Sequence, residues 1–213
     1  MRFNSFLESV VKIKHLNLIG EISHAKMSPP YRLELAEKMK ENSKMAKKAG
    51  VMALFYPNTK GETYFVLILR KTYKGVHSAQ VGFPGGRYEK EDKDLKVTAL
   101  RETREEVGVP ESIMSVIKTM SPLYIPPSNF IVHPYIAVSE STPNFIKQDE
   151  EVEAIIEVSL LDFLDKANTI TARVPTSFGV EADVPAFKLN DHIVWGATAM
   201  MLGEIKDLLK QVL

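Results

Sequence analysis

Residues 83–109 read FPGGRYEKEDKDLKVTALRETREEVGV, and the interpretation of the whole chain starts from this stretch. Gly85 and Gly86 predict a sharp loop, because only glycine adopts a positive φ at little cost. Residues 95–107 then predict a helix, and Gly108 is its stop signal. A glycine loop leading into a helix is therefore expected at the centre of the fold.

Three glutamates share one face of this predicted helix. Glu102, Glu105 and Glu106 are spaced i, i+3 and i+4, so their carboxylates crowd together. Like charges at this spacing destabilise an isolated helix by about 0.2–0.5 kcal/mol per pair. A divalent cation would reverse that cost, and hard cations such as Mg²⁺ bind carboxylates together with substrate phosphates. The cluster predicts a metal site that holds a phosphate ester or diphosphate.

A simpler interpretation of the same residues is a solvated helix face. In that case Arg101 and Glu105 would form an ordinary i,i+4 ion pair without any bound metal. The glycine loop and the fixed-length lead in front of the helix make a longer composite pattern, which favours the metal site.

The composite pattern resembles the Nudix box, usually written G-x5-E-x7-R-E-U-x-E-E-x-G-U with U apolar. Gly86 opens it, and residues 101–109 carry its second half. Asp92 stands where the box has Glu, eight residues rather than seven separate Asp92 from Arg101, and Thr103 replaces an aliphatic residue. The resemblance implies an α/β/α sandwich with a mixed β-sheet, in which the acidic face of the helix points to a cleft.

The resemblance also implies roles for individual residues. Glu102, Glu105 and Glu106 would bind Mg²⁺ or Mn²⁺, and Glu105 would also act in catalysis. Arg101 would orient a glutamate through a bidentate salt link, which lysine could not make. Family members differ in their general base. Glu151, in the acidic run 149–151 just before an apolar segment, is the candidate here, and a solvated acidic loop is the alternative.

The residues ahead of the box resemble the branch of Nudix hydrolases that cleaves coenzyme A. That branch shows roughly L-L-T-x-R-[SA]-x3-R-x3-G-x3-FPGG, and Arg70 and residues 83–86 match it at the right spacing. The resemblance implies hydrolysis of coenzyme A, or of an acylated or oxidised form, to phosphopantetheine and adenosine 3′,5′-bisphosphate. The residues that would contact this substrate are Arg70, His77, Phe83, Gly85 and Gly86. The positions that depart from the motif are Ile68, Lys71, Gly75 and Ala79.

Three other functions remain open. The same chemistry could act on another nucleoside diphosphate derivative, such as ADP-ribose, NADH or a dinucleoside polyphosphate. A Nudix-fold sensor would bind a nucleotide without cleaving it, although binding alone does not require the complete set Glu102, Glu105 and Glu106. An α/β domain with a merely decorated helix would not need the glycine loop.

Composition limits the partners and the location. The chain has 213 residues with 27 basic and 27 acidic side chains, so no net charge attracts it to nucleic acid or anionic membranes. No apolar run is long enough to cross a membrane, and charges interrupt the first residues, unlike a signal peptide. Cysteine is absent, which excludes disulfides and thiol chemistry. We expect a cytoplasmic enzyme whose partner is a small nucleotide-derived substrate.

The order of elements predicts a layered α/β domain. Residues 1–48 are expected to form an N-terminal helical extension packed on the same domain, and residues 49–213 to form the Nudix domain. The extension could be a cap or part of a homodimer surface. Residues 31–48 predict one helix, and Pro134 places the strand at 130–138 at a sheet edge or bulge. Residues 196–212 predict a closing helix with an apolar stripe.

Overall fold

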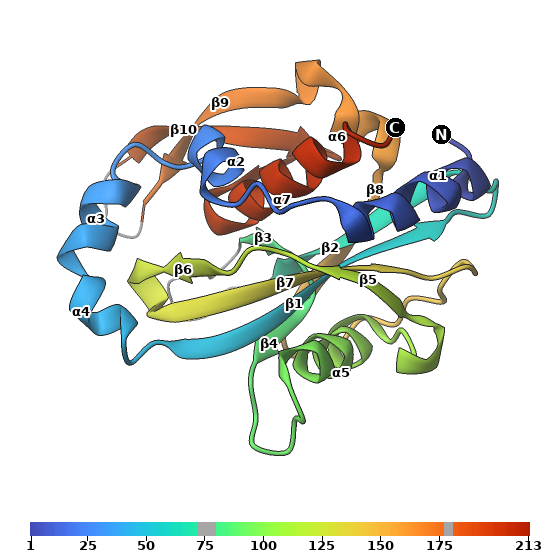
Figure 1. Cartoon of the computed structure of the whole chain (residues 1–213), viewed down its shortest axis with the longest axis horizontal. Helices are drawn as coiled ribbons and strands as arrows, with labels where there is room; N and C mark the ends of the chain where they lie inside the picture. Colours follow the sequence, from blue (N-terminus) through green and yellow to red (C-terminus); the bar gives the residue numbers. More distant parts are fainter. Residues whose placement is uncertain (72–79, 177–180) are drawn as a thin grey trace.

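The computed structural model describes residues 1–71, 80–176 and 181–213, and a long central strand organises them (Figure 1). This strand, β1 (Lys47–Pro57), is apolar along most of its length. Its side chains alternate between two cores: Val51, Ala53 and Phe55 belong to one, and Met52 and Leu54 to the other. Because both faces of β1 are buried, its sequence is a continuous apolar run without polar alternation.

The main sheet is mixed, as predicted. Strand β1 pairs in parallel with β7 (Phe130–Val138) and antiparallel with both β2 (Thr63–Arg70) and β4 (Gly85–Arg87). The order through the sheet is β3-β2-β1-β7-β5, with β8 added to β2 and β6 added to β7. The bounds of these outer strands are β3 Val81–Gly82, β5 Ser115–Thr119, β6 Leu123–Ile125 and β8 Val152–Ser159.

Helices cover both faces of the main sheet, which confirms the predicted fold class. Helix α5 (Leu95–Val107) lies on one face, and α7 (Gly196–Leu209) lies on the other (Figure 1). A second sheet of three strands, in the order β11-β10-β9, covers the far side of α7. The bounds of the remaining elements are β9 Thr169–Pro175, β10 Glu181–Leu189, β11 His192–Trp195, α6 Leu160–Leu164, η2 Glu111–Ile113, η3 Pro126–Ser128 and η4 Lys166–Asn168.

Since α7 is enclosed between two sheets, it is buried on more sides than the predicted single stripe, and it ends at Leu209. None of the helices among the described residues is both long and apolar enough to cross a membrane.

The first three helical segments pack into the core on the α7 side. They are α1 (Phe3–Val10), η1 (Val11–His15) and α2 (Glu21–Lys26), and they bury Phe6, Val10 and Ile13 fully. A buried polar contact adds to this packing: Glu204 of α7 accepts a hydrogen bond from the Gly20 N–H at 2.8 Å and lies 3.3 Å from His24 Nε2. These contacts join the N-terminal helices to the closing helix.

The prediction of one helix over residues 31–48 was wrong. The chain forms two short helices, α3 (Arg32–Lys38) and α4 (Lys40–Ser43), and Lys47 and Lys48 already belong to β1. Parallel pairing of Lys47 with Phe130 draws these lysines into the sheet. Helix propensity is local, and this long-range pairing overrides it.

Pro134 predicted a sheet edge or a bulge, and the edge position was wrong. Strand β7 is paired on both sides, with β1 along its length and with β5 and β6 on the other flank. Pro134 lies between the register of β6, which reaches Val132, and that of β5, which begins at Tyr135. The missing N–H therefore falls in the gap where one partner strand gives way to the next.

Gly50 allows α5 to lie directly on β1. A Cβ atom at this position would come within 2.3 Å of the Leu95 carbonyl oxygen and 3.0 Å of the Ala99 nitrogen. Both obstacles are backbone atoms, so relief requires the helix to move away from the strand. The glycine thus fixes the distance between the helix and the sheet.

We expect Gly50→Ala to lower the free energy of unfolding by about 1–3 kcal/mol, as overpacking in a core does. Urea unfolding followed by circular dichroism measures it. Gly82→Ala is the matched control, because its nearest described neighbour would be Thr198 Oγ1 at 3.9 Å. Equal stability of the two variants would contradict close packing at Gly50.

Candidate active site

Helix α5 has well-defined ends, and these set the direction of its carboxylates. Asp94 caps the first turn, with Oδ1 accepting a hydrogen bond from the Val97 N–H at 2.9 Å. Gly108 ends the helix in the left-handed region at φ 74°. The caps confirm the predicted helix at its predicted bounds.

Arg101 is the centre of an ion-pair network on this helix. Its Nε and Nη2 atoms each lie 2.9 Å from a carboxylate oxygen of Asp92, a bidentate pair that keeps the pKa of Asp92 well below its usual range. Its Nη1 atom contacts both Glu102 and Glu105 at 3.0 Å. Arg101 therefore contacts two glutamates of the helix, but its bidentate partner is an aspartate in the lead segment.

Glu106 is the most buried carboxylate of the site. Its side chain is 3% exposed, Oε2 accepts a hydrogen bond from the Gly85 N–H at 2.7 Å, and Oε1 lies 3.2 Å from Arg70 Nη1. Burial raises the pKa of Glu106 to about 7, and the nearby Glu102 and Glu151 charges also raise it, while Arg70 and the Gly85 N–H oppose the shift. The fold thus holds a carboxylate in a position that disfavours its charge.

The glycines ahead of the helix form a strand, which corrects the predicted loop. Gly85 (φ 149°) and Gly86 lie in β4, paired with Val51 and Gly50 of β1. A Cβ at Gly85 would lie 2.4 Å from the Gly50 carbonyl oxygen, and one at Gly86 would lie 2.4 Å from Glu102 Oε2. The strand has no side chains here because carboxylates and backbone occupy that space, and the Gly85 N–H is already bonded to Glu106.

Glu151 lies on the same side of the molecule as these carboxylates. Pairing of Arg70 with Val152 brings the residues just before β8 alongside Arg70, and the Lys71 N–H donates to the Glu151 carbonyl at 2.9 Å. Glu102 has a raised pKa, chiefly through burial, and the charges of Glu105 and Glu151 raise it further. The charge of Glu151 therefore acts on both Glu102 and Glu106, and the charge of Glu102 acts on Glu106.

A bound cation would relieve this repulsion. Divalent cations favour such groups of carboxylates, and two of the three side chains are largely buried. In the part of the chain that the structure describes, no three His, Asp or Glu side chains already have a metal-binding arrangement. Arginines hold the carboxylates instead: Arg70 contacts Glu106, and Arg101 contacts Glu102. The donor set fits a hard cation that would replace part of these contacts.

Glu105 differs from its two neighbours. Its side chain is 46% exposed, and it pairs with Arg101 and with Arg104, each at 3.0 Å. The i,i+4 pair that the simpler interpretation predicted is therefore present, at the outer margin of the cluster. Glu102 and Glu106 carry the buried part of the site.

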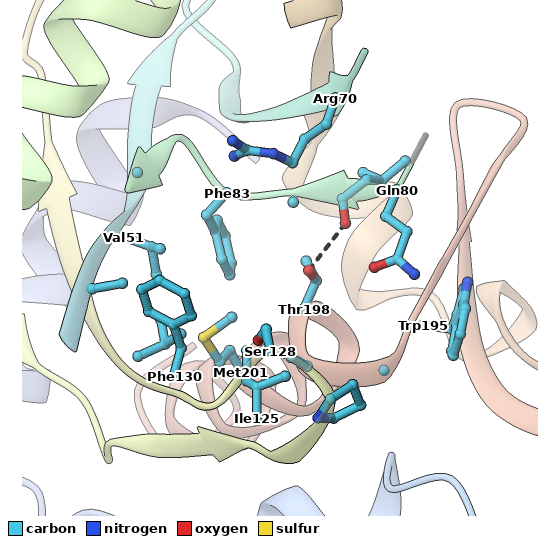
Figure 2. A pocket seen from close by; sticks show the side chains of 18 of the residues that line it. Val51, Arg70, Gln80, Phe83, Ile125, Ser128, Phe130, Trp195, Thr198 and Met201 are labelled. Atoms are coloured by element: carbon cyan, nitrogen blue, oxygen red, sulfur yellow. Dashed lines mark hydrogen bonds between the residues drawn. The ribbon is translucent and has the colours of Figure 1, made fainter. Parts of the chain in front are cut away.

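A cavity of about 370 Å³ lies beside the glycine strand, on the α7 side of the sheet. Figure 2 shows the Phe83 and Phe130 side chains at this cavity, with Arg70 at the top of the view and both Gln80 and Trp195 at the right. Gly85, Gly86 and Arg70 belong both to the cavity wall and to the surroundings of the carboxylates. Charged chemistry and an apolar pocket therefore meet along one glycine strand.

The structure brings together most of the residues that the sequence singled out. The carboxylates of Glu102 and Glu106 lie beside Arg70, Gly85, Gly86 and Arg101, and the charge of Glu151 acts on Glu106. Glu105 lies at the margin of this group, and Phe83 lies in the cavity. His77 lies outside the described residues. Sequence reasoning missed Gly50, although a glycine inside an apolar strand is a recognised signal of close backbone approach. It also missed the cavity walls from residues 29–35 and from Phe130, for which no local signal exists.

Comparisons with known proteins agree with this geometry. Residues 46–176 match the family model of the NUDIX domain. The chain is 30% identical over 151 residues to a protein of Yersinia pestis described as the uncharacterized Nudix hydrolase NudL, covering 71% of this chain and 73% of that protein. The counterpart from Yersinia pseudotuberculosis gives the same values. A MutT/nudix family protein from Enterococcus faecalis has a similar fold, with a TM-score of 0.52 at 15% identity over 78% of this chain and 62% of the other.

The raised pKa of Glu106 predicts how stability without metal depends on pH. The folded state holds this proton up to about pH 7, whereas the unfolded chain releases it near 4.5, so stability should fall as the pH rises through this window. Added Mg²⁺ or Mn²⁺ favours the ionised carboxylate and should raise Tm by several degrees more at pH 8 than at pH 5.5.

Thermal unfolding of the wild type and of Glu106→Gln, with and without metal, measures both effects. Without metal, the stability of the glutamine variant should depend on pH much less than that of the wild type. An equal metal-induced shift of Tm at both pH values would contradict this assignment.

Proposed function

The chain belongs to the Nudix family and is a pyrophosphohydrolase of nucleoside diphosphate derivatives, and from this premise we propose that its substrate is coenzyme A or a derivative of it. Hydrolysis of the diphosphate bond would give phosphopantetheine and adenosine 3′,5′-bisphosphate. The observation that carries the site assignment is the burial of Glu102 and Glu106 beside a strand of two glycines, at the mouth of an apolar cavity.

Nudix hydrolases generally use divalent metals, and we infer that Mg²⁺ or Mn²⁺ would bind to Glu102, Glu105 and Glu106. Such an ion supplies neutralisation of the diphosphate charge and acidification of a water nucleophile. The mutual repulsion of the carboxylates and their burial support the assignment. Glu105, turned toward Arg101 and Arg104, would join the ligands by changing rotamer.

Protein side chains would orient and polarise the reacting groups. Arg101, fixed by Asp92, contacts Glu102, so that the position of this carboxylate is set before substrate arrives. Arg70 lies at the junction of the carboxylates and the cavity, where its guanidinium can bind a phosphate oxygen. Binding of a cation at Glu106 would free Arg70 for this role.

Glu151 is the proposed general base. Its side chain is exposed, and its charge acts on both Glu102 and Glu106. An exposed carboxylate next to a cation site can accept a proton from water and release it to solvent. Its backbone is fixed beside Arg70 by the Lys71 hydrogen bond, which holds the side chain near the diphosphate.

Two observations favour coenzyme A over other nucleoside diphosphate derivatives. Arg70 and residues 83–86 match the motif of the coenzyme A branch, and Arg70, Phe83, Gly85 and Gly86 line one cavity. The cavity wall is mainly aliphatic and aromatic, which suits a long apolar arm better than a second sugar. ADP-ribose, NADH or a dinucleoside polyphosphate are the alternative substrates, and a nucleotide sensor is the alternative without catalysis.

A substrate panel tests the proposal. The protein with Mg²⁺ or Mn²⁺ is offered coenzyme A, ADP-ribose, NADH and diadenosine polyphosphates, and products are separated by chromatography. We expect the highest kcat/KM for coenzyme A or an acyl form of it, with phosphopantetheine as a product. Preference for ADP-ribose would refute the substrate, and no turnover of any compound would favour the sensor.

Variants in the same assay test the site. Glu106→Gln should lower kcat by at least about 100-fold while the protein stays folded, because an essential ligand is lost. The control Glu111→Gln removes an exposed carboxylate at 43% exposure that pairs with Arg104, and it should retain activity.

A further inference from the structure

We propose that the segment 29–35, contributed by the N-terminal extension, is a specificity-determining wall of the substrate pocket that selects a substrate with an apolar arm. This inference deepens the proposed function and rests on it for the position of the diphosphate. The segment supplies Pro29, Tyr31, Arg32 and Leu35 to the cavity, opposite residues of the Nudix domain.

Polar contacts hold the segment against the domain. Arg32 Nη2 donates a hydrogen bond to the Tyr124 carbonyl, and the Tyr124 hydroxyl lies 3.0 Å from Asn129 Oδ1 and 3.5 Å from the Met39 carbonyl oxygen. Burial lowers the pKa of Arg32, as expected for a guanidinium enclosed at a joint. Helices α3 and α4 stand beside β6 in Figure 1, consistent with these contacts. The wall is therefore built from a part of the chain far in sequence from the catalytic helix.

The lining of the cavity identifies the chemistry of its ligand. Aliphatic and aromatic side chains dominate, and among the described residues no Asp or Glu lines it. The side chains with polar groups are mainly hydrogen-bond donors: Arg32, Arg70, Arg87, Tyr31, Trp195, Gln80, Ser128 and Thr198. Thr198 already donates to the Val81 carbonyl at 3.0 Å. Ser128 Oγ is buried without a hydrogen-bond partner in the described part of the chain. Such a site suits a mainly aliphatic chain that carries amide groups. It suits a ribose poorly, because the ribose hydroxyls need several hydrogen-bond acceptors.

The cavity and the carboxylates share part of their surroundings. Arg70, Gly85 and Gly86 lie both in the cavity wall and beside the carboxylates, whereas Tyr31 and Leu35 belong to the wall formed by residues 29–35. A diphosphate at the glycine strand would therefore direct the arm on one of its sides into the cavity, toward the N-terminal wall. In coenzyme A the arm of matching chemistry is pantetheine.

Two leucines of α3 provide a matched pair for a test. Leu35 lines the cavity and is partly buried, whereas Leu33 on the same helix is 77% exposed and does not line the cavity. The same substitution at each position has similar effects on the helix itself, and it changes the wall only at Leu35.

Trp195 provides the readout. It is the single tryptophan of the chain, and it lines the cavity, so intrinsic fluorescence reports on ligands there. The full-length protein is titrated with phosphopantetheine and, separately, with adenosine 3′,5′-bisphosphate. Neither probe contains a diphosphate bond, so binding is measured without turnover.

We expect a saturable change with phosphopantetheine in the wild type. Leu35→Ala should raise the Kd for phosphopantetheine about fivefold, a smaller effect than the loss of a fully buried leucine would have. Leu35→Asp should raise this Kd more than about tenfold, because it places a charge in an apolar wall. Leu33→Ala and Leu33→Asp should stay within about twofold of wild type. Adenosine 3′,5′-bisphosphate should not displace phosphopantetheine.

Three results would overturn the proposal: no saturable binding of phosphopantetheine, equal Kd values for the Leu35 and Leu33 variants, or displacement by adenosine 3′,5′-bisphosphate. Failure of the proposed function would differ from all three, because the wild type would then bind phosphopantetheine without hydrolysing coenzyme A. Circular dichroism of each variant checks that the Leu35 effects come from a folded protein.

Discussion

The site depends on one constraint: two glutamates of a single helix are buried against a strand that has no room for side chains. Glu102 fills the space where a Gly86 side chain would stand, and Glu106 takes the Gly85 N–H as a hydrogen-bond donor. Burying carboxylates this way disfavours their charged form, and the raised pKa of Glu106 reflects it. Buried carboxylates of this kind contribute little to the stability of the fold by themselves, and a bound cation would offset the cost of burying their charge.

Strand β1 connects this cluster with the pocket. On the α5 side, Gly50 lets the helix approach the sheet closely, which brings the carboxylates under the glycine strand. On the α7 side, Ala49 and Val51 line the cavity. The register between β1 and β4 therefore sets where the carboxylates and the pocket meet. A change in that register would separate diphosphate chemistry from recognition of the rest of the substrate.

The sequence predicted the parts of the molecule that local signals determine. Helix α5 has the predicted bounds, residues 95–107, with Gly108 as its stop, and the strand predicted at 130–138 is β7. The helix expected over residues 31–48 failed because Lys47 and Lys48 pair with β7, a partner more than 80 residues away. The glycine loop proved to be a strand for the same reason, since its pairing with β1 is not visible in local sequence.

The candidate site shows the same division. The box residues were identified because they lie close together in sequence, and Glu151 was proposed from an acidic run before a strand. The walls at Tyr31, Leu35 and Phe130 come from two regions far apart in sequence and share a cavity only after folding. A resemblance to a motif therefore locates the chemistry, whereas the surface that would choose the substrate requires the three-dimensional structure.

Anomalous scattering from manganese-soaked crystals is the most direct test of the central claim. The account predicts an anomalous peak bounded by the carboxylates of Glu102 and Glu106 beside Gly86, with the side chain of Arg70 moved away from Glu106. A structure in which these carboxylates keep their arginine partners, and in which manganese binds elsewhere or not at all, would contradict it.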